Sequence, residues 1–199
     1  VDGLEFRAAR YAGVFFTGSG SNITIQNCNV RGGYNRGIAT GFGPIGNTVI
    51  TGDSVSDICG DGISLYRSGT ISNCVVQRIS LLRGLGTELR ESDAMVVMGM
   101  GIFADTDLDS NATGTVTNCR VDSTGYCGIY APTVTNSYVS NAVLTLADGG
   151  GIYFYWGHAD GWGCNRPYFD HNIVDGVFQD TLGSAFILPV GAGLYVDGY

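Results

Sequence analysis

Two patterns of apolar and polar residues alternate along the chain. In the first, small polar and branched apolar residues alternate and then meet an Asn, as in Thr70-Ile71-Ser72-Asn73. Such alternation over a few residues, with β-branched side chains, is typical of a strand, and the Asn favours a tight turn. Copies of this pattern occupy residues 23–30, 70–76, 115–121, 133–139 and 168–174.

The second pattern is a Gly followed by a branched apolar residue, often with an aromatic residue next. Its seven copies begin at Gly13, Gly37, Gly62, Gly101, Gly128, Gly151 and Gly193. The uninterrupted spacings are 24, 25, 27 and 23 residues, and the longer ones of 39 and 42 correspond to one unit plus an insertion. A fixed period of this length predicts a solenoid, in which each unit buries its apolar face against its neighbours.

Each unit therefore contains a strand, an Asn-type turn, a second strand, a loop, the Gly-Ile strand and another loop. This order resembles the right-handed parallel β-helix of the pectate-lyase-like and β-helix glycoside hydrolase superfamily, an all-β solenoid. The resemblance implies one domain of about six to seven coils over residues 1–199, expected to be a segment of a longer helix without its caps. Loop insertions are predicted near residues 80–98, 156–167 and 179–191.

Composition narrows the choice of partners. The 199 residues include 10 basic and 18 acidic side chains, which gives a net charge of -8 and argues against nucleic acid or an anionic membrane as a partner. No apolar run is long enough to cross a bilayer. We expect a secreted or cell-surface protein, and we expect end-to-end or neighbouring-domain contacts at exposed strand edges.

Three cysteines occupy the same position of their units, namely Cys28, Cys74 and Cys119. Stacked coils would place them in a column with neighbours about 4.8 Å apart. We favour buried thiols that pack as small apolar side chains, and a Cys74–Cys119 disulfide is the alternative. The cysteine and histidine spacings match no zinc site, so we expect no cofactor, with Ca²⁺ left open.

Side chains alternate between the two faces of a strand, so the Gly-Ile strands can be divided by phase. If the Ile side chains point inward, two columns point outward. The first is Phe15, Ala39, Ser64, Phe103, Tyr130, Tyr153 and Tyr195, and the second is Thr17, Gly41, Tyr66, Asp105, Pro132, Tyr155 and Asp197. The aromatic members predict a platform on which sugar rings stack, unless loops or a partner chain cover it. Trp156 and His158, in the insertion that follows, are expected to help line this groove.

Two sequence motifs resemble those of proteins with known functions, namely residues 148–153, which begin with Asp148, and residues 193–197, which end with Asp197. They resemble a pairing in β-helix glycoside hydrolases, where Asp-Gly-Gly-Gly-Ile-Tyr is followed one coil later by Gly-Ile-Tyr-x-Asp. The β-helix xylosidases use acidic residues of neighbouring coils here as nucleophile and acid, which implies these roles for Asp148 and Asp197. The xylosidases use a Glu as the acid, whereas the cleft strands of this chain contain none.

Asp61 has a weaker resemblance, because Gly60-Asp61-Gly62-Ile63 is similar to a strand start of polygalacturonase-type hydrolases. The further aspartates that those enzymes need are missing, since Arg36 precedes Gly37 and Met100 precedes Gly101.

The leading hypothesis is a glycoside hydrolase that acts on a neutral plant or algal polysaccharide. A polysaccharide lyase is an alternative, although lyases act on anionic uronates and this chain is acidic and has no Lys. The other class is a non-catalytic structural, adhesive or fibre-forming solenoid. Long polar and aromatic insertions beside one strand favour an enzyme or a sugar-binding protein over a plain shaft.

Overall fold

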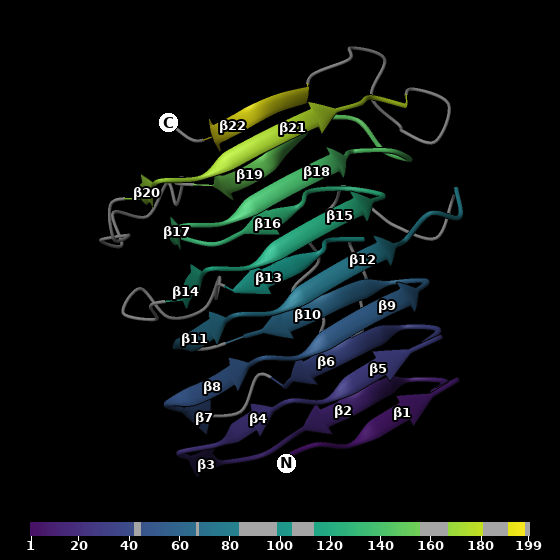
Figure 1. The fold of residues 1–199 in the computed structure, drawn as a ribbon, viewed down its shortest axis with the longest axis vertical. Coiled ribbons are helices and arrows are strands. Elements are labelled where there is room, and N and C mark those ends of the chain that lie inside the picture. Colours follow the sequence, from purple (N-terminus) through teal and green to yellow (C-terminus); the bar gives the residue numbers. More distant parts are fainter. Residues whose placement is uncertain are drawn as a thin grey trace.

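The computed structural model describes residues 1–41, 45–66, 68–83, 99–104, 114–155, 167–180 and 191–197. Within them nearly all strands belong to three sheets, in each of which parallel strands from successive coils are stacked. Figure 1 shows the coils following one another from the N-terminal to the C-terminal end. We call the three sheets A, B and C. This arrangement confirms the prediction of an all-β parallel solenoid.

The bounds of the strands follow from the two sequence patterns. Sheet A contains β4 (Thr24–Gln26), β8 (Thr48–Thr51), β11 (Gly69–Ser72), β14 (Gly114–Thr117), β17 (Thr133–Thr135) and β20 (Tyr168–Asp170). Sheet B contains β1 (Glu5–Arg7), β5 (Asn29–Arg31), β9 (Ser54–Ile58), β12 (Val75–Ile79), β15 (Arg120–Thr124), β18 (Tyr138–Ala142) and β21 (Ile173–Val177). Sheet C contains β2 (Ala12–Phe16), β6 (Arg36–Thr40), β10 (Asp61–Leu65), β13 (Ile102–Ala104), β16 (Ile129–Tyr130), β19 (Gly149–Tyr155) and β22 (Gly191–Asp197). The short strands β3 (Gly20–Ser21) and β7 (Ile45–Gly46) pair with each other.

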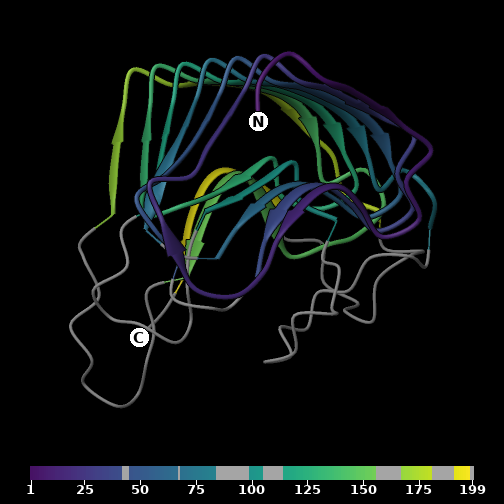
Figure 2. The ribbon, with the colours of Figure 1, turned by 90° about the horizontal axis from the view of Figure 1, so that it is seen from below.

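The chain visits sheets A, B and C in turn, and each strand pairs in parallel with its equivalent one coil later. Figure 2 looks along the stack, where successive coils overlie one another. The predicted register is also confirmed, since Ile63 pairs with Ile38 on one side and with Ile102 on the other. The Gly-Ile strands are therefore the strands of sheet C.

Apolar side chains that point inward from the strands of all three sheets fill the interior of the coils. From β2 to β19 the inward branched residues of sheet C are buried and contact buried valines and isoleucines of sheets A and B, whereas Leu194 on the last strand, β22, is 53% exposed. The sheet C members of this core are Val14, Ile38, Ile63, Ile102, Ile129 and Ile152. The inward phase predicted from the sequence is thus confirmed.

The turn from sheet A to sheet B uses the left-handed backbone region. Asn27, Asn73, Asn118 and Asn136 all have φ between 51° and 55°, which Asn tolerates better than most residues. The Asn118 side-chain amide donates a hydrogen bond to Asn73 Oδ1 one coil below, at 2.5 Å. The Asn residues therefore set both the turn and part of the contact between coils.

The next position along each coil is the predicted cysteine column. Cys28, Cys74 and Cys119 are buried free thiols, which confirms the thiol interpretation over a Cys74–Cys119 disulfide. A hydrogen bond with Cys119, together with burial, raises the pKa of the Cys74 thiol, so this sulfur stays protonated at neutral pH.

Acid should weaken an ion-pair cluster on the outside of sheet B. Asp57 accepts hydrogen bonds from Arg78 Nε at 2.6 Å and from Arg31 Nε at 3.1 Å, and Arg78 lowers the pKa of Asp57 to about 2. The pKa is below its unfolded value, so this carboxylate stabilises the fold above pH 4. That stabilisation, about 1 kcal/mol for side chains this exposed, is lost as the pH falls through 2.

The measurement is urea unfolding between pH 2 and pH 5. We expect Asp57→Asn to flatten the decline in the free energy of unfolding over this range relative to the wild type. Asp175→Asn removes the same charge from an exposed site on the same sheet and should leave the decline unchanged. Parallel curves for the wild type and Asp57→Asn would contradict the assignment.

Candidate functional site

The aromatic residues of sheet C form the continuous column that the sequence predicts. Phe103 pairs in register with Tyr130, Tyr130 with Tyr153, and Tyr153 with Tyr195. Their ring centroids are 5.3, 5.3 and 5.1 Å apart in that order, and Tyr66 lies 5.0 Å from Phe103. These distances are typical of aromatic contacts, so the rings stabilise one another along the stack.

Most of this column is buried, so the prediction of an exposed aromatic platform is wrong for it. The exposed fractions are 2% for Phe103 and Tyr130 and 9% for Tyr66 and Tyr153. The physical reason is a second apolar cluster on the outer face of sheet C, which also contains Met100, Tyr126, Cys127, Leu146 and Phe154. Tyr126 and Leu146 come from the connections that precede β16 and β19, so the described connections themselves help to cover the face.

The accessible part of the predicted site lies at the last two coils. Asp148, Tyr155, Tyr195 and Asp197 are all half-buried, and Tyr155 pairs in register with Asp197 across β19 and β22. A ligand that approaches sheet C would therefore meet these four side chains rather than Phe103 or Tyr130.

Asp148 is held at the entrance of β19 by its backbone and its side chain. Its φ of 57° lies in the left-handed region, and its carbonyl oxygen accepts a hydrogen bond from the Tyr126 hydroxyl at 2.9 Å. The Tyr195 hydroxyl donates to Asp148 Oδ1 at 3.4 Å. The carboxylate is thus tied to a side chain of the next coil.

Asp197 is held by its side chain at the other end of the strand pair. The Tyr153 hydroxyl donates to Asp197 Oδ2 at 3.1 Å. Burial, followed by the negative charge of Asp197, raises the pKa of Tyr153, and burial with Asp148 and Asp197 raises the pKa of Tyr195. Both phenols therefore keep their protons at neutral pH and act as donors to the carboxylates.

The result is a row of two carboxylates and two aromatic rings along β19 and β22. The strand register separates the acidic residues, because Gly149, next to Asp148, pairs with Gly191, whereas Asp197 pairs with Tyr155. Tyr153 and Tyr195 lie between these ends with their rings in edge contact. Each carboxylate therefore accepts a hydrogen bond from a tyrosine of the adjacent coil.

A family model described as a right-handed β-helix region matches residues 1–99 and 46–198. The chain belongs to the right-handed β-helix family. No curated protein and no solved structure matches the chain significantly.

Membership of the β-helix family establishes the fold and names no reaction. Three residues expected to line the groove, Asp105, Trp156 and His158, lie outside the described residues of this β-helix. Among the described residues, no group of three or more His, Cys, Asp or Glu side chains is placed to hold a metal ion. The described part of the chain also contains no helix long and apolar enough to span a membrane.

Asp61 belongs to a different part of the β-helix, under the second apolar cluster. It is buried with Arg36, whose Nε lies 3.6 Å from Asp61 Oδ2, and Asp61 Oδ1 accepts the backbone N–H groups of Gly99 and Met100 at 2.8 and 3.1 Å. Arg36 Nη2 donates to the Tyr66 hydroxyl at 3.0 Å. Sequence reasoning missed this pair, although the signal was present: Arg36 and Asp61 hold the same register position in adjacent coils.

Proposed function

We propose that this β-helix protein is a carbohydrate-active enzyme, a glycoside hydrolase with Asp148 and Asp197 as its carboxyl pair. The observation that supports it best is the row of side chains at β19 and β22. There, two half-buried carboxylates on adjacent coils are each hydrogen bonded to a tyrosine of the other coil. Polar groups fixed beside accessible aromatic rings are what a sugar site requires.

Glycoside hydrolysis needs two carboxyl groups, one to protonate the leaving oxygen and one to attack the sugar or to activate water. We assign these two roles to the Asp148 and Asp197 pair. The tyrosine hydroxyls stay protonated, so they donate the hydrogen bonds that orient the two carboxyl groups. The rings of Tyr155 and Tyr195 would lie against the faces of bound sugars.

The same phenols argue against the lyase alternative. A lyase that used Tyr153 or Tyr195 as its base would need a phenolate near neutral pH, whereas their surroundings raise the pKa of both. A polyuronate would also be repelled by Asp148, Asp197 and the overall charge of -8. We therefore propose a neutral polysaccharide substrate and a secreted or cell-surface location.

The test follows reducing ends and absorbance at 235 nm together, on neutral and uronic polysaccharides. We expect new reducing ends without absorbance, and we expect Asp148→Asn and Asp197→Asn each to abolish them. Asp175→Asn, an exposed carboxylate on β21, is the matched control and should stay active. Absorbance at 235 nm would establish a lyase instead. Silence on every substrate would overturn the hydrolase and leave a binding or structural β-helix.

A further inference from the structure

The outer face of sheet A carries a regular array of hydroxyl groups. Three of its strands, β11, β14 and β17, each place two hydroxyl side chains outward, one on either side of a buried Ile or Val. Figure 1 shows these strands one above another at the left of the molecule. Strand pairing aligns the hydroxyls in two columns, the first with Thr70, Thr115 and Thr133, and the second with Thr51 of β8, Ser72, Thr117 and Thr135.

Hydrogen bonds between coils fix the second column of this hydroxyl array. The Ser72 hydroxyl donates to Thr51 Oγ1, and the Thr135 hydroxyl donates to Thr117 Oγ1, each at 2.9 Å. Such bonds between neighbouring strands stabilise a sheet, and the branched Cβ of Thr restricts its χ1 angle further. The hydroxyl oxygens are therefore held in place before a partner binds, so that binding costs little side-chain entropy.

The hydroxyl array is accessible, in contrast to the outer face of sheet C. All seven of its residues are half-buried, as expected for side chains that stand in register on an uncovered sheet. Phe103 and Tyr130 of sheet C, which also point outward, are only 2% exposed because a second apolar cluster covers them. A partner that approaches sheet A would therefore meet an even surface of hydroxyl and methyl groups.

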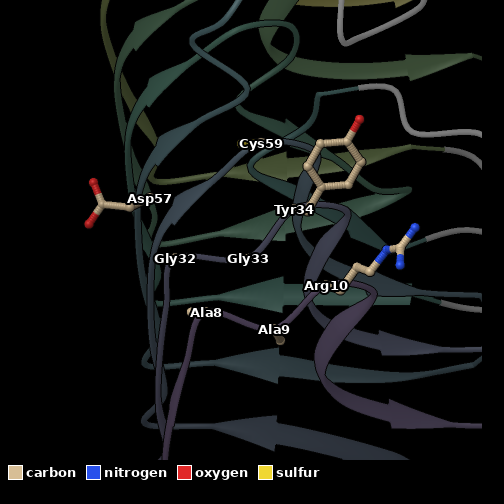
Figure 3. Close-up of a pocket in the computed structure, with 8 residues that line it drawn as sticks. All are labelled: Ala8, Ala9, Arg10, Gly32, Gly33, Tyr34, Asp57 and Cys59. Carbon is tan, nitrogen blue, oxygen red and sulfur yellow. The ribbon is translucent and has the colours of Figure 1, made fainter.

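No charge interrupts this surface. The described strands β8, β11, β14 and β17 contain no Asp, Glu, Lys, Arg or His, although the chain has 10 basic and 18 acidic residues. Sheet B, in contrast, carries the ion pairs of Asp57 with Arg31 and Arg78 on its outer face. Figure 3, a view of the hollow beside the first coils, shows the Asp57 side chain pointing away from the coils. An uncharged lattice of hydrogen-bonding groups thus complements sheet A and does not complement sheet B.

The backbone sets the spacing of the hydroxyl array in two directions. Adjacent parallel strands lie about 4.8 Å apart, and side chains two residues apart on one strand are separated by about 6.6 Å. On a prism face of ice, the oxygen atoms repeat at similar distances along two perpendicular directions. Each of these oxygen atoms donates and accepts hydrogen bonds, as a Thr or Ser hydroxyl also does.

From the spacing, the fixed side chains and the absence of charge on these strands, we infer that the outer face of sheet A binds ice. The hydroxyl columns hold water molecules at positions of the ice lattice, and these molecules bridge the protein and the crystal. The face is separate from Asp148 and Asp197, so the inference does not rest on the proposed hydrolase activity.

Thermal hysteresis, the gap between the melting and freezing temperatures of a seed crystal, tests the inference on the full chain. We expect the wild type to show this gap and to inhibit the recrystallisation of ice. Thr115→Tyr places a bulky side chain within the hydroxyl array and should abolish both effects. Val75→Tyr is the matched control, because it places the same side chain on the outer face of sheet B, where Val75 is 41% exposed. It should retain both effects.

Circular dichroism and the unfolding midpoint establish that each variant is folded, and Thr70→Tyr, in the same column, takes the place of Thr115→Tyr if that variant does not fold. The variant Asp148→Asn/Asp197→Asn should keep its thermal hysteresis, which separates this inference from the hydrolase. The absence of hysteresis in the wild type, or equal losses in Thr115→Tyr and Val75→Tyr, would overturn the inference. A wild-type dimer in sedimentation that Thr115→Tyr dissociates would also overturn it, since the face would then be a contact between two copies of the chain.

Discussion

Replacing Gly62 by alanine is expected to destabilise the protein by about 3 kcal/mol or more. A Cβ atom at this position would overlap the carbonyl oxygen of Gly101 in the next coil and would lie 2.6 Å from Val76 Cγ1. One of the two obstacles is backbone fixed by the parallel pairing of β10 and β13, so it cannot move aside without separating the coils. The cost therefore exceeds that of a usual overpacked core.

Urea unfolding of Gly62→Ala and Gly46→Ala measures this effect. Gly46 also lies in a strand, but a Cβ atom there meets nothing within 4 Å and the backbone is not left-handed, so the second variant should stay within about 0.5 kcal/mol of the wild type. Similar midpoints for the two variants would show that the stack tolerates a side chain where sheets B and C approach. The same carbonyl overlap recurs at Gly37, Gly101 and Gly128, and a Cβ atom at Gly151 would overlap the Val174 side chain, which explains why a Gly precedes the branched residue in these coils.

Replacing Arg36 by methionine should cost about 3–5 kcal/mol of folding free energy. Arg36 and Asp61 are both 1% exposed, so the substitution leaves a buried carboxylate without its cation. It also removes the hydrogen bond from Arg36 to the Tyr66 hydroxyl. Methionine keeps much of the volume, and the loss therefore reports the charge rather than a cavity.

Thermal and urea unfolding would compare this variant with Arg7→Met, which breaks the exposed pair between Arg7 and Glu5. The control should cost less than about 1 kcal/mol, because water screens such pairs. The double variant Arg36→Met/Asp61→Leu should recover only part of the loss, since Leu cannot accept the N–H groups of Gly99 and Met100. A cost below about 1 kcal/mol for Arg36→Met would refute the buried ion pair as a source of stability.

The repeat made the fold and register predictable. The Gly-Ile motif and the Asn turn each reflect a local steric requirement. At Gly62 the backbone closely approaches the next coil, and at Asn73 the backbone is left-handed. Because the residue type alone reveals each requirement, the spacing of these residues along the chain predicts the positions of the strands of sheet C. The pairing of Tyr153 with Tyr195 and of Tyr155 with Asp197 followed directly.

The repeat does not predict which side chains cover the outer face of sheet C. Alternation predicts that Phe103 and Tyr130 point away from the coil interior, which is correct, but it does not predict that other side chains lie on top of them. Burial there depends on contacts from Tyr126 and Leu146, which belong to connections without a repeating pattern. The roles of Asp148 and Asp197 stay predictions, whereas their tyrosine donors emerge only from the three-dimensional arrangement.

The pairing of each strand with its equivalents in adjacent coils has a consequence for how the molecule opens. β12, for example, has β9 and β15 as its neighbours in sheet B, so its backbone hydrogen bonds depend on two coils alone. Energetic coupling in such a linear array passes from one nearest neighbour to the next. Amide protons of β12 should therefore exchange with solvent only after the flanking coils have separated, so that the stack opens one coil after another.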